Sequence, residues 1–133
     1  MIEVPVERPR PSSVRWEELF LAAATTAFLL VPHPWIGLVV AFNGVLCHVS
    51  AAFACRWEAV TRHWDVAGNV GIGVWANFHA CAQPICGAIT AVSLIAWLAQ
   101  PREQPLACRA AYHAAFVQMP LLAAFSHFAF ACR

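Results

Sequence analysis

Two histidines and one aspartate are the side chains best suited to chemistry, because each falls near the end of a long apolar stretch. They are His48, Asp65 and His113. If these stretches are antiparallel membrane helices, a rise of 1.5 Å per residue places all three within roughly 10 Å of one interface. Two imidazoles and a carboxylate supply three zinc ligands and leave a fourth position for water. The set predicts a zinc site in which His48 and His113 bind the metal.

Asp65 has a second interpretation in the same site. Its carboxylate is expected to act catalytically by holding the zinc-bound water, or to orient a ligand histidine from behind. Ionisable groups inside a membrane are costly, so each is a functional candidate. Asn43, Asn77 and Gln118 are instead interpreted as hydrogen-bond partners between helices.

The composition requires a membrane to position these groups. Of 133 residues, 61% are hydrophobic and 11% charged, and the mean hydropathy is +0.63. Soluble domains carry about 25% charged residues. Residues 21–54 and 66–100 contain no Asp, Glu, Lys or Arg. We therefore expect an all-α, multi-pass integral membrane protein whose main partner is the lipid bilayer. No basic patch or phosphate loop suits nucleic acid.

Prolines and polar stretches divide the chain into a polar tail, 1–16, and a transmembrane helical domain, 17–133. Val-Pro-His-Pro at 31–34 stops the first helix, because proline lacks the backbone donor. Gln83-Pro84 separates two further helices, 56–64 and 101–105 are polar loops, and Pro120 is expected to kink the last helix. The expected helices are about 17–31, 35–55, 65–81, 85–99 and 107–130.

The arginines set the orientation of these five helices. There is no lysine, and the tail, successive connections and C-terminus carry 3, 0, 2, 0, 2 and 1 arginines. This alternation is what the positive-inside rule predicts for five crossings with the N-terminus inside.

The stretch from Leu46 to Asn69 resembles the second and third helices of the progestin and adipoQ receptor family. That family belongs to the CREST superfamily, with alkaline ceramidases and related membrane hydrolases. The match is a histidine near the end of one helix, a basic loop, and an aspartate 17 positions later at the start of the next. The resemblance implies a zinc-dependent hydrolase of lipid amides, or a receptor-like relative. It assigns His48 to the zinc and Asp65 to the zinc-bound water.

The chain also departs from that family. Gly44 stands where the family has a serine four residues before its histidine. Arg109 stands where the family has the first histidine of a His-x-x-x-His pair, so only His113 matches. Five expected helices replace seven.

Two alternatives belong to other functional classes. His113 and His127 are 14 residues apart, which places them about 40° from each other on a regular helix. His127 would then face His79 while His113 faces His48, and paired axial histidines on facing helices hold b-type haem. The other alternative is a non-catalytic membrane subunit of a larger complex, with no cofactor.

Cysteines add little chemistry. The six cysteines fit no zinc-finger spacing and are interpreted as small apolar helix residues. Cys81 and Cys86 flank an expected outer turn, where a disulfide would be sterically reasonable.

Overall fold

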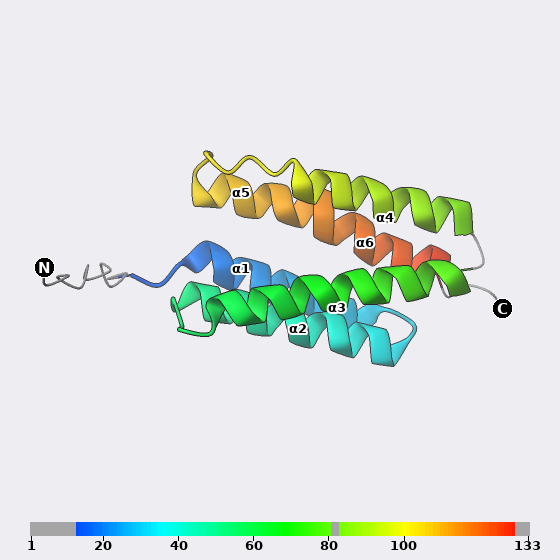
Figure 1. Ribbon diagram of the computed structural model, residues 1–133, viewed down its shortest axis with the longest axis horizontal. Helices are drawn as coiled ribbons and strands as arrows, with labels where there is room; N and C mark the ends of the chain where they lie inside the picture. The colour runs from blue at the N-terminus through cyan, green and yellow to red at the C-terminus, as the bar shows by residue number, and fades with distance from the viewer. Residues whose placement is uncertain (1–12, 81–82, 130–133) are drawn as a thin grey trace, which may run out of the picture.

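The computed structural model describes residues 13–80 and 83–129, and within these ranges the chain is helical with no strand. Five consecutive helical segments run up and down along one axis (Figure 1). The first is α1 (Trp16–Thr25), continued by the 3₁₀ turn η1 (Thr26–Leu30). The second, third and fourth are α2 (Pro34–Ala52), α3 (Glu58–His79) and α4 (Gln83–Leu98). The fifth consists of α5 (Leu106–His113), the π-helical η2 (Ala114–Gln118), α6 (Met119–Ala123) and the π-helical η3 (Ala124–Ala129).

The segments pack as a three-helix group and a hairpin. Helix α2 lies between α1 and α3, while α4 packs against the fifth segment. Contacts of α1 with α5, and of α3 with α4, join the two groups into one bundle. All-α architecture with five helical segments, as expected from the sequence, is confirmed.

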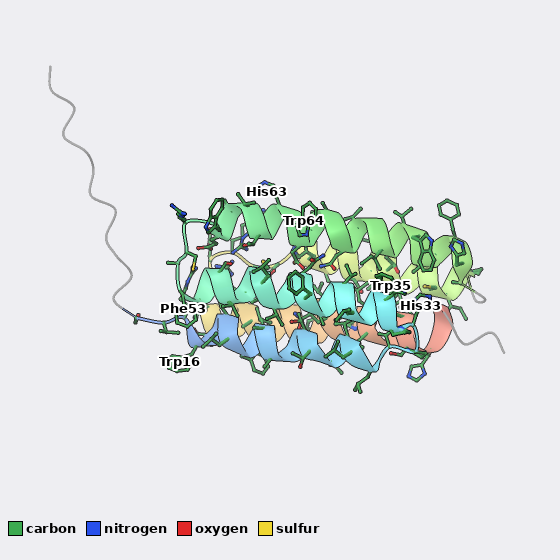
Figure 2. The ribbon with its side chains drawn as sticks, turned by 90° about the horizontal axis from the view of Figure 1, so that it is seen from below. Trp16, His33, Trp35, Phe53, His63 and Trp64 are labelled. Carbon is green, nitrogen blue, oxygen red and sulfur yellow. The ribbon has the colours of Figure 1, made fainter. Side chains whose placement is uncertain are left out.

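Charged side chains gather at one end of the bundle. The α2–α3 and α4–α5 connections lie at the same end of the bundle as the start of α1, as Figure 1 shows. In Figure 2, Trp16 and Phe53 mark this end, and His33 and Trp35 mark the opposite one. Every Asp, Glu and Arg of the described ranges lies within about two helical turns of this charged end. They are Arg15, Glu17, Glu18, Arg56, Glu58, Arg62, Asp65, Arg102, Glu103 and Arg109.

Hydrogen bonds tie three elements together there. The Arg15 backbone N–H donates to the Ala52 carbonyl at 3.1 Å, joining the start of α1 to the end of α2. The Arg15 guanidinium also donates to Glu58 at 2.8 Å, and Glu58 accepts from Arg62 at 3.2 Å. Thus the first turn of α3 is fixed to the entry of α1.

Helix α3 begins earlier than the sequence suggested. Its expected start at Asp65 was wrong, because α3 starts at Glu58 and most of the expected polar loop 56–64 is helical. Helix α2 ends at Ala52 in a Schellman motif: Ala54 N–H donates to Ala51, and Cys55 N–H donates to Ser50. Ala54 takes the left-handed conformation at φ 48°. This tight turn leaves only residues 53–57 between the helices.

The fifth helical segment is irregular around Pro120, where the sequence predicts a kink, and the irregularity consists of π-helical turns. Pro120 lies in the first turn of α6, and the turn that precedes it is the π-helical η2. Because proline has no N–H to donate, a helix must alter its hydrogen bonding nearby. Here the altered bonding takes the form of π turns before and after α6.

A cluster of buried apolar side chains lies away from the charged end. Phe28, Val40, Ala76 and Phe125 belong to one buried cluster, and the rings of Phe28 and Phe125 meet edge to face at 6.4 Å. Within the described ranges one helix, α2, is long and apolar enough to cross a membrane, and Pro84–Leu98 is a shorter apolar helix.

Candidate functional site

A buried histidine pair lies near the charged end of the bundle. The imidazole rings of His48 on α2 and His113 at the end of α5 approach to 5.9 Å between centroids, at 73° to each other. The structure therefore brings together the two residues that the sequence placed at a common depth. His48 is only 9% exposed.

Each imidazole is held through its Nδ1 atom. His48 Nδ1 lies 2.8 Å from Glu18 Oε2, and the Glu18 side chain on α1 is itself buried. His113 Nδ1 lies 3.4 Å from Gln100 Oε1. A carboxylate oxygen and an amide oxygen can only accept, so each Nδ1 carries a proton. When either ring is neutral, its Nε2 atom therefore has the lone pair that can accept a proton or bind a metal.

Gln100 contacts α5 at a second point besides the His113 ring. Its amide nitrogen donates to the Arg109 carbonyl at 3.1 Å, one turn before His113. The end of α4 is therefore tied to α5 next to the histidine pair.

Asp65 completes the polar group from α3. It lines the same cavity as His48 and His113, and Asn69 Nδ2 donates to its carboxylate at 3.0 Å. Asp65 lies about two turns inside α3 rather than at its start. Because α3 starts earlier than expected, Asp65 lies within the helix and lines the cavity, and it does not stand at the helix N-terminus.

These groups open onto an elongated cavity of about 370 Å³. Its volume lies at the lower end of the range of roughly 300–1,000 Å³ that small-molecule sites occupy. The histidines and Asp65 lie toward the charged end, whereas Phe28, Phe78 and Phe125 line the region toward the other end. Most of the remaining wall is aliphatic or aromatic, with Val40, Val66, Val70, Val74, Leu94, Trp97, Val117 and Leu121.

A smaller and more polar cavity of about 70 Å³ lies on the other side of the histidine pair. His48 and His113 line both cavities, and the smaller one also includes Glu18, Arg62 and Arg109. The pair thus lies between an apolar chamber and a polar pocket near the charged surface.

The potential metal ligands of the described residues do not form a complete metal site. In the described part of the chain, no three His, Cys, Asp or Glu side chains are grouped so that they could hold a metal ion. Structural zinc takes four protein ligands and catalytic zinc three. His48 and His113 supply two suitable nitrogens, but the arrangement lacks a third ligand.

Of the four histidines in the haem hypothesis, His48 and His113 line the cavity, whereas His79 and His127 do not. His79 is exposed at the end of α3, where its ring stacks on Trp75 at 4.5 Å and Nδ1 donates to the Trp75 carbonyl at 2.9 Å. His127 is exposed on η3. The 40° offset of His127 from His113 assumed 100° per residue, and the two intervening π-helical stretches do not follow that period.

The structure shows the surroundings of Gly44 and Arg109, the two positions at which the chain departs from the CREST pattern. A Cβ atom on Gly44 would lie 2.6 Å from Thr25 Cγ2, so α1 and α2 approach too closely there for the family's serine. Arg109, in the place of the first histidine, lines the polar pocket, and its Nε is buried without a hydrogen-bond partner.

Glu18 and Gln100 are the site residues that the sequence did not single out. Glu18 is an acidic residue in the first turn of an apolar helix, at the depth expected for His48, and that coincidence is the signal that could have identified it. Gln100 carried no comparable signal. Cys81 lies outside the described residues, and Cys86 is a buried free cysteine.

No protein-family model, curated protein or solved structure matches this chain.

Proposed function

We propose that the chain is a multi-pass membrane protein that binds an amphipathic, lipid-like molecule inside its helical bundle. The observation that carries the proposal is the largely apolar cavity of about 370 Å³ with His48, Asp65 and His113 toward one end. An apolar tail fits the valine- and phenylalanine-lined region, and a polar head fits the histidines and the carboxylate.

The membrane part of the proposal is supported by the surface of the bundle. Large apolar side chains are exposed along its length, including Leu30 at 80%, Phe78 at 75% and Ile95 at 63%. Such side chains are stable against lipid, whereas soluble monomers rarely expose large continuous apolar patches. All described charges lie at one end, and the arginine-bearing connections are on that side, as the positive-inside rule requires of a cytoplasmic face.

Two measurements test the membrane proposal. Alkaline carbonate is expected to leave the protein in the membrane pellet. Cys55 is exposed at the charged end, so a variant retaining only this cysteine should react with a membrane-impermeant maleimide in inside-out vesicles and not in right-side-out vesicles. Extraction by carbonate, or labelling from the outside, would refute the topology.

Glycines on α3 allow a matched test of the cavity. Gly73 lines the cavity and has room for a Cβ, the nearest atom being Thr90 Cγ2 at 3.7 Å. Gly73→Leu should therefore fill the cavity. Gly71 is exposed with nothing within 4 Å of an added Cβ, so Gly71→Leu is the control. Native mass spectrometry with added 1-dodecanol should detect a bound molecule on wild type and on Gly71→Leu, and at least about tenfold less on Gly73→Leu. Equal binding by all three proteins would place the ligand elsewhere.

A zinc-dependent hydrolase of the CREST type is the second candidate. It is favoured by the Glu18–His48 hydrogen bond, since histidines that bind zinc commonly donate their other N–H to a carboxylate. Zinc, where bound, would supply an activated water. The described part of the chain offers this zinc two histidine ligands, His48 and His113. Metal analysis should find one zinc per chain, lost in both His48→Ala and His113→Ala, and a metal content unchanged by either variant would remove this candidate.

A further inference from the structure

Charged groups are distributed unequally between the two cavities. In the described part of the chain, Asp65 is the one carboxylate that lines the large cavity of about 370 Å³, and no arginine lines it. His48 and His113 are the other ionisable side chains of its wall. Arg62 and Arg109 line the small polar pocket instead. The large cavity therefore offers a bound molecule a carboxylate and no guanidinium.

Asp65 has no ion-pair partner among the described residues. The basic groups whose charge reaches its carboxylate are His48 and Arg62. Each of them contacts a different carboxylate, because His48 lies 2.8 Å from Glu18 and Arg62 lies 3.2 Å from Glu58. The nearby positive charge of the protein is thus already paired, and Asp65 is left without a counter-ion.

One oxygen of Asp65 remains available to a bound molecule. Asn69 donates to Oδ1 at 3.0 Å, whereas Oδ2 accepts no hydrogen bond from the described residues. The described side-chain atoms that are both unpartnered and sealed from solvent lie on other residues, so Oδ2 is accessible. Asp65 lines the large cavity and not the small pocket. This oxygen is therefore available to a molecule bound in the large cavity.

The chemistry of the cavity favours a cationic head group. A carboxylate inside a membrane protein is costly without a partner of opposite charge. A neutral head group leaves that charge uncompensated, and an anionic one would repel it. The two cavity histidines use Nδ1–H for Glu18 and Gln100, so in the neutral form they have no further donor to offer an anion. A protonated amine supplies both a positive charge and N–H donors.

We propose that the ligand of the large cavity is a long-chain amine bound as its ammonium ion. Asp65 is its counter-ion, and the alkyl chain lies along the wall lined by valines and phenylalanines. The inference rests on the proposed binding of an amphipathic molecule and names the head group that the cavity selects.

Three probes of equal chain length separate charge recognition from apolar binding. At neutral pH dodecylamine is a cation, 1-dodecanol is neutral and dodecanoate is an anion. In native mass spectrometry titrations from a non-ionic detergent, wild type should bind dodecylamine at least about tenfold more tightly than 1-dodecanol, and dodecanoate least tightly. Asp65→Asn keeps the size of the side chain and an acceptor for Asn69. It should weaken dodecylamine binding by about tenfold or more and change 1-dodecanol binding by less than about twofold.

Two further variants control for net charge and for location. Glu103 is exposed in the α4–α5 connection, so Glu103→Gln removes a carboxylate outside the cavity and should bind all three probes as wild type does. Gly73→Leu, which fills the cavity, should weaken dodecylamine and 1-dodecanol alike.

Thermal denaturation checks that Asp65→Asn folds normally. Its midpoint without ligand should not fall, because the variant removes an unpaired carboxylate and keeps the bond to Asn69. Added dodecylamine should raise the midpoint of wild type more than that of the variant, since a ligand stabilises in proportion to its affinity for the folded state.

The outcomes distinguish the two proposals. If dodecylamine and 1-dodecanol bind wild type equally, or dodecanoate binds best, the ammonium inference is overturned and binding in the cavity stands. If Asp65→Asn keeps the preference for dodecylamine, or Glu103→Gln loses it too, Asp65 is not the counter-ion. If no probe binds wild type, the proposed binding function fails and the inference fails with it.

Discussion

Glu18 and His48 form a buried pair whose partners come from different helices. Their 2.8 Å contact joins the first turn of α1 to the last part of α2, and both side chains are shielded from solvent. A buried polar group stabilises a fold only while its partner is present, because the unpaired partner keeps the full cost of desolvation. The pair therefore orients His48 and also links two helices.

Replacing Glu18 should reveal that link. Glu18→Leu leaves His48 Nδ1 buried without an acceptor and should lower the free energy of unfolding by about 1–3 kcal/mol. Glu18→Gln keeps an acceptor oxygen and should lose less. Denaturation of the detergent-solubilised protein, followed by circular dichroism, measures both. A Leu variant as stable as wild type would contradict the role given to the pair.

Gly44 allows a test of how closely α1 and α2 approach each other. Gly44→Ser should destabilise the protein by about 1–3 kcal/mol, since its Cβ would lie 2.6 Å from Thr25 Cγ2. Adding Thr25→Ala removes that methyl group and should recover most of the loss. The comparison requires Thr25→Ala alone as the reference, with thermal midpoints as the measurement. No recovery in the double variant would show that the contact is not the cause.

At the level of elements, the turn between α2 and α3 contains the one non-glycine residue with a positive φ in the described part of the chain. Ala54 occupies the left-handed position of a Schellman motif, which glycine usually fills because it has no Cβ. An L-residue there costs about 1–2 kcal/mol. The bonds from Ala54 and Cys55 to the end of α2 hold the conformation in place.

Ala54→Gly should therefore raise the free energy of unfolding by about 1 kcal/mol. Ala67 is exposed inside α3, and Ala67→Gly should lower stability by about the same amount, because glycine is a poor helix former. Opposite signs for the same substitution, measured by denaturation, would verify the turn. A loss of stability in both variants would contradict it.

The same turn explains where the sequence prediction failed. Prolines and polar stretches predicted five helical segments, and their ends agree to within a few residues except at the start of α3. The charged residues Arg56 to His63 were taken for a loop, but Glu58 and Arg62 lie four apart and pair on one helix face. Because alanine occupies the left-handed position of this Schellman motif, the sequence lacks the glycine that usually indicates the end of a helix. The depth of His48 and His113 followed from topology, whereas the lateral packing that adds Glu18 and Gln100 did not.

For the whole molecule, charge is distributed unevenly between the two ends of the bundle. Every described Asp, Glu and Arg lies toward one end, and the opposite end carries only histidines among its ionisable side chains in the described ranges, apart from cysteine thiols. In the membrane orientation that we propose, this asymmetry favours one direction of insertion. It also places the polar pocket beside the histidine pair near the charged face.

Removing arginines from that end should disturb orientation without disturbing packing. Replacing Arg8, Arg10 and Arg56 by Gln should let a fraction of chains insert in the inverted direction, seen as labelling of Cys55 from both sides of the membrane. Glu3→Gln with Glu7→Gln is the matched control, because acidic residues contribute little to topology. A single orientation in the arginine variant would mean that something other than the positive-inside rule directs insertion.

The π-helical stretches at 114–118 and 124–129 change which residues share a face of the fifth helical segment. A π turn closes its hydrogen bond over five residues where an α turn uses four. Side chains beyond each stretch therefore fall on a different face from the one that 100° per residue predicts. His113 lies before both stretches, so its position opposite His48 does not depend on them.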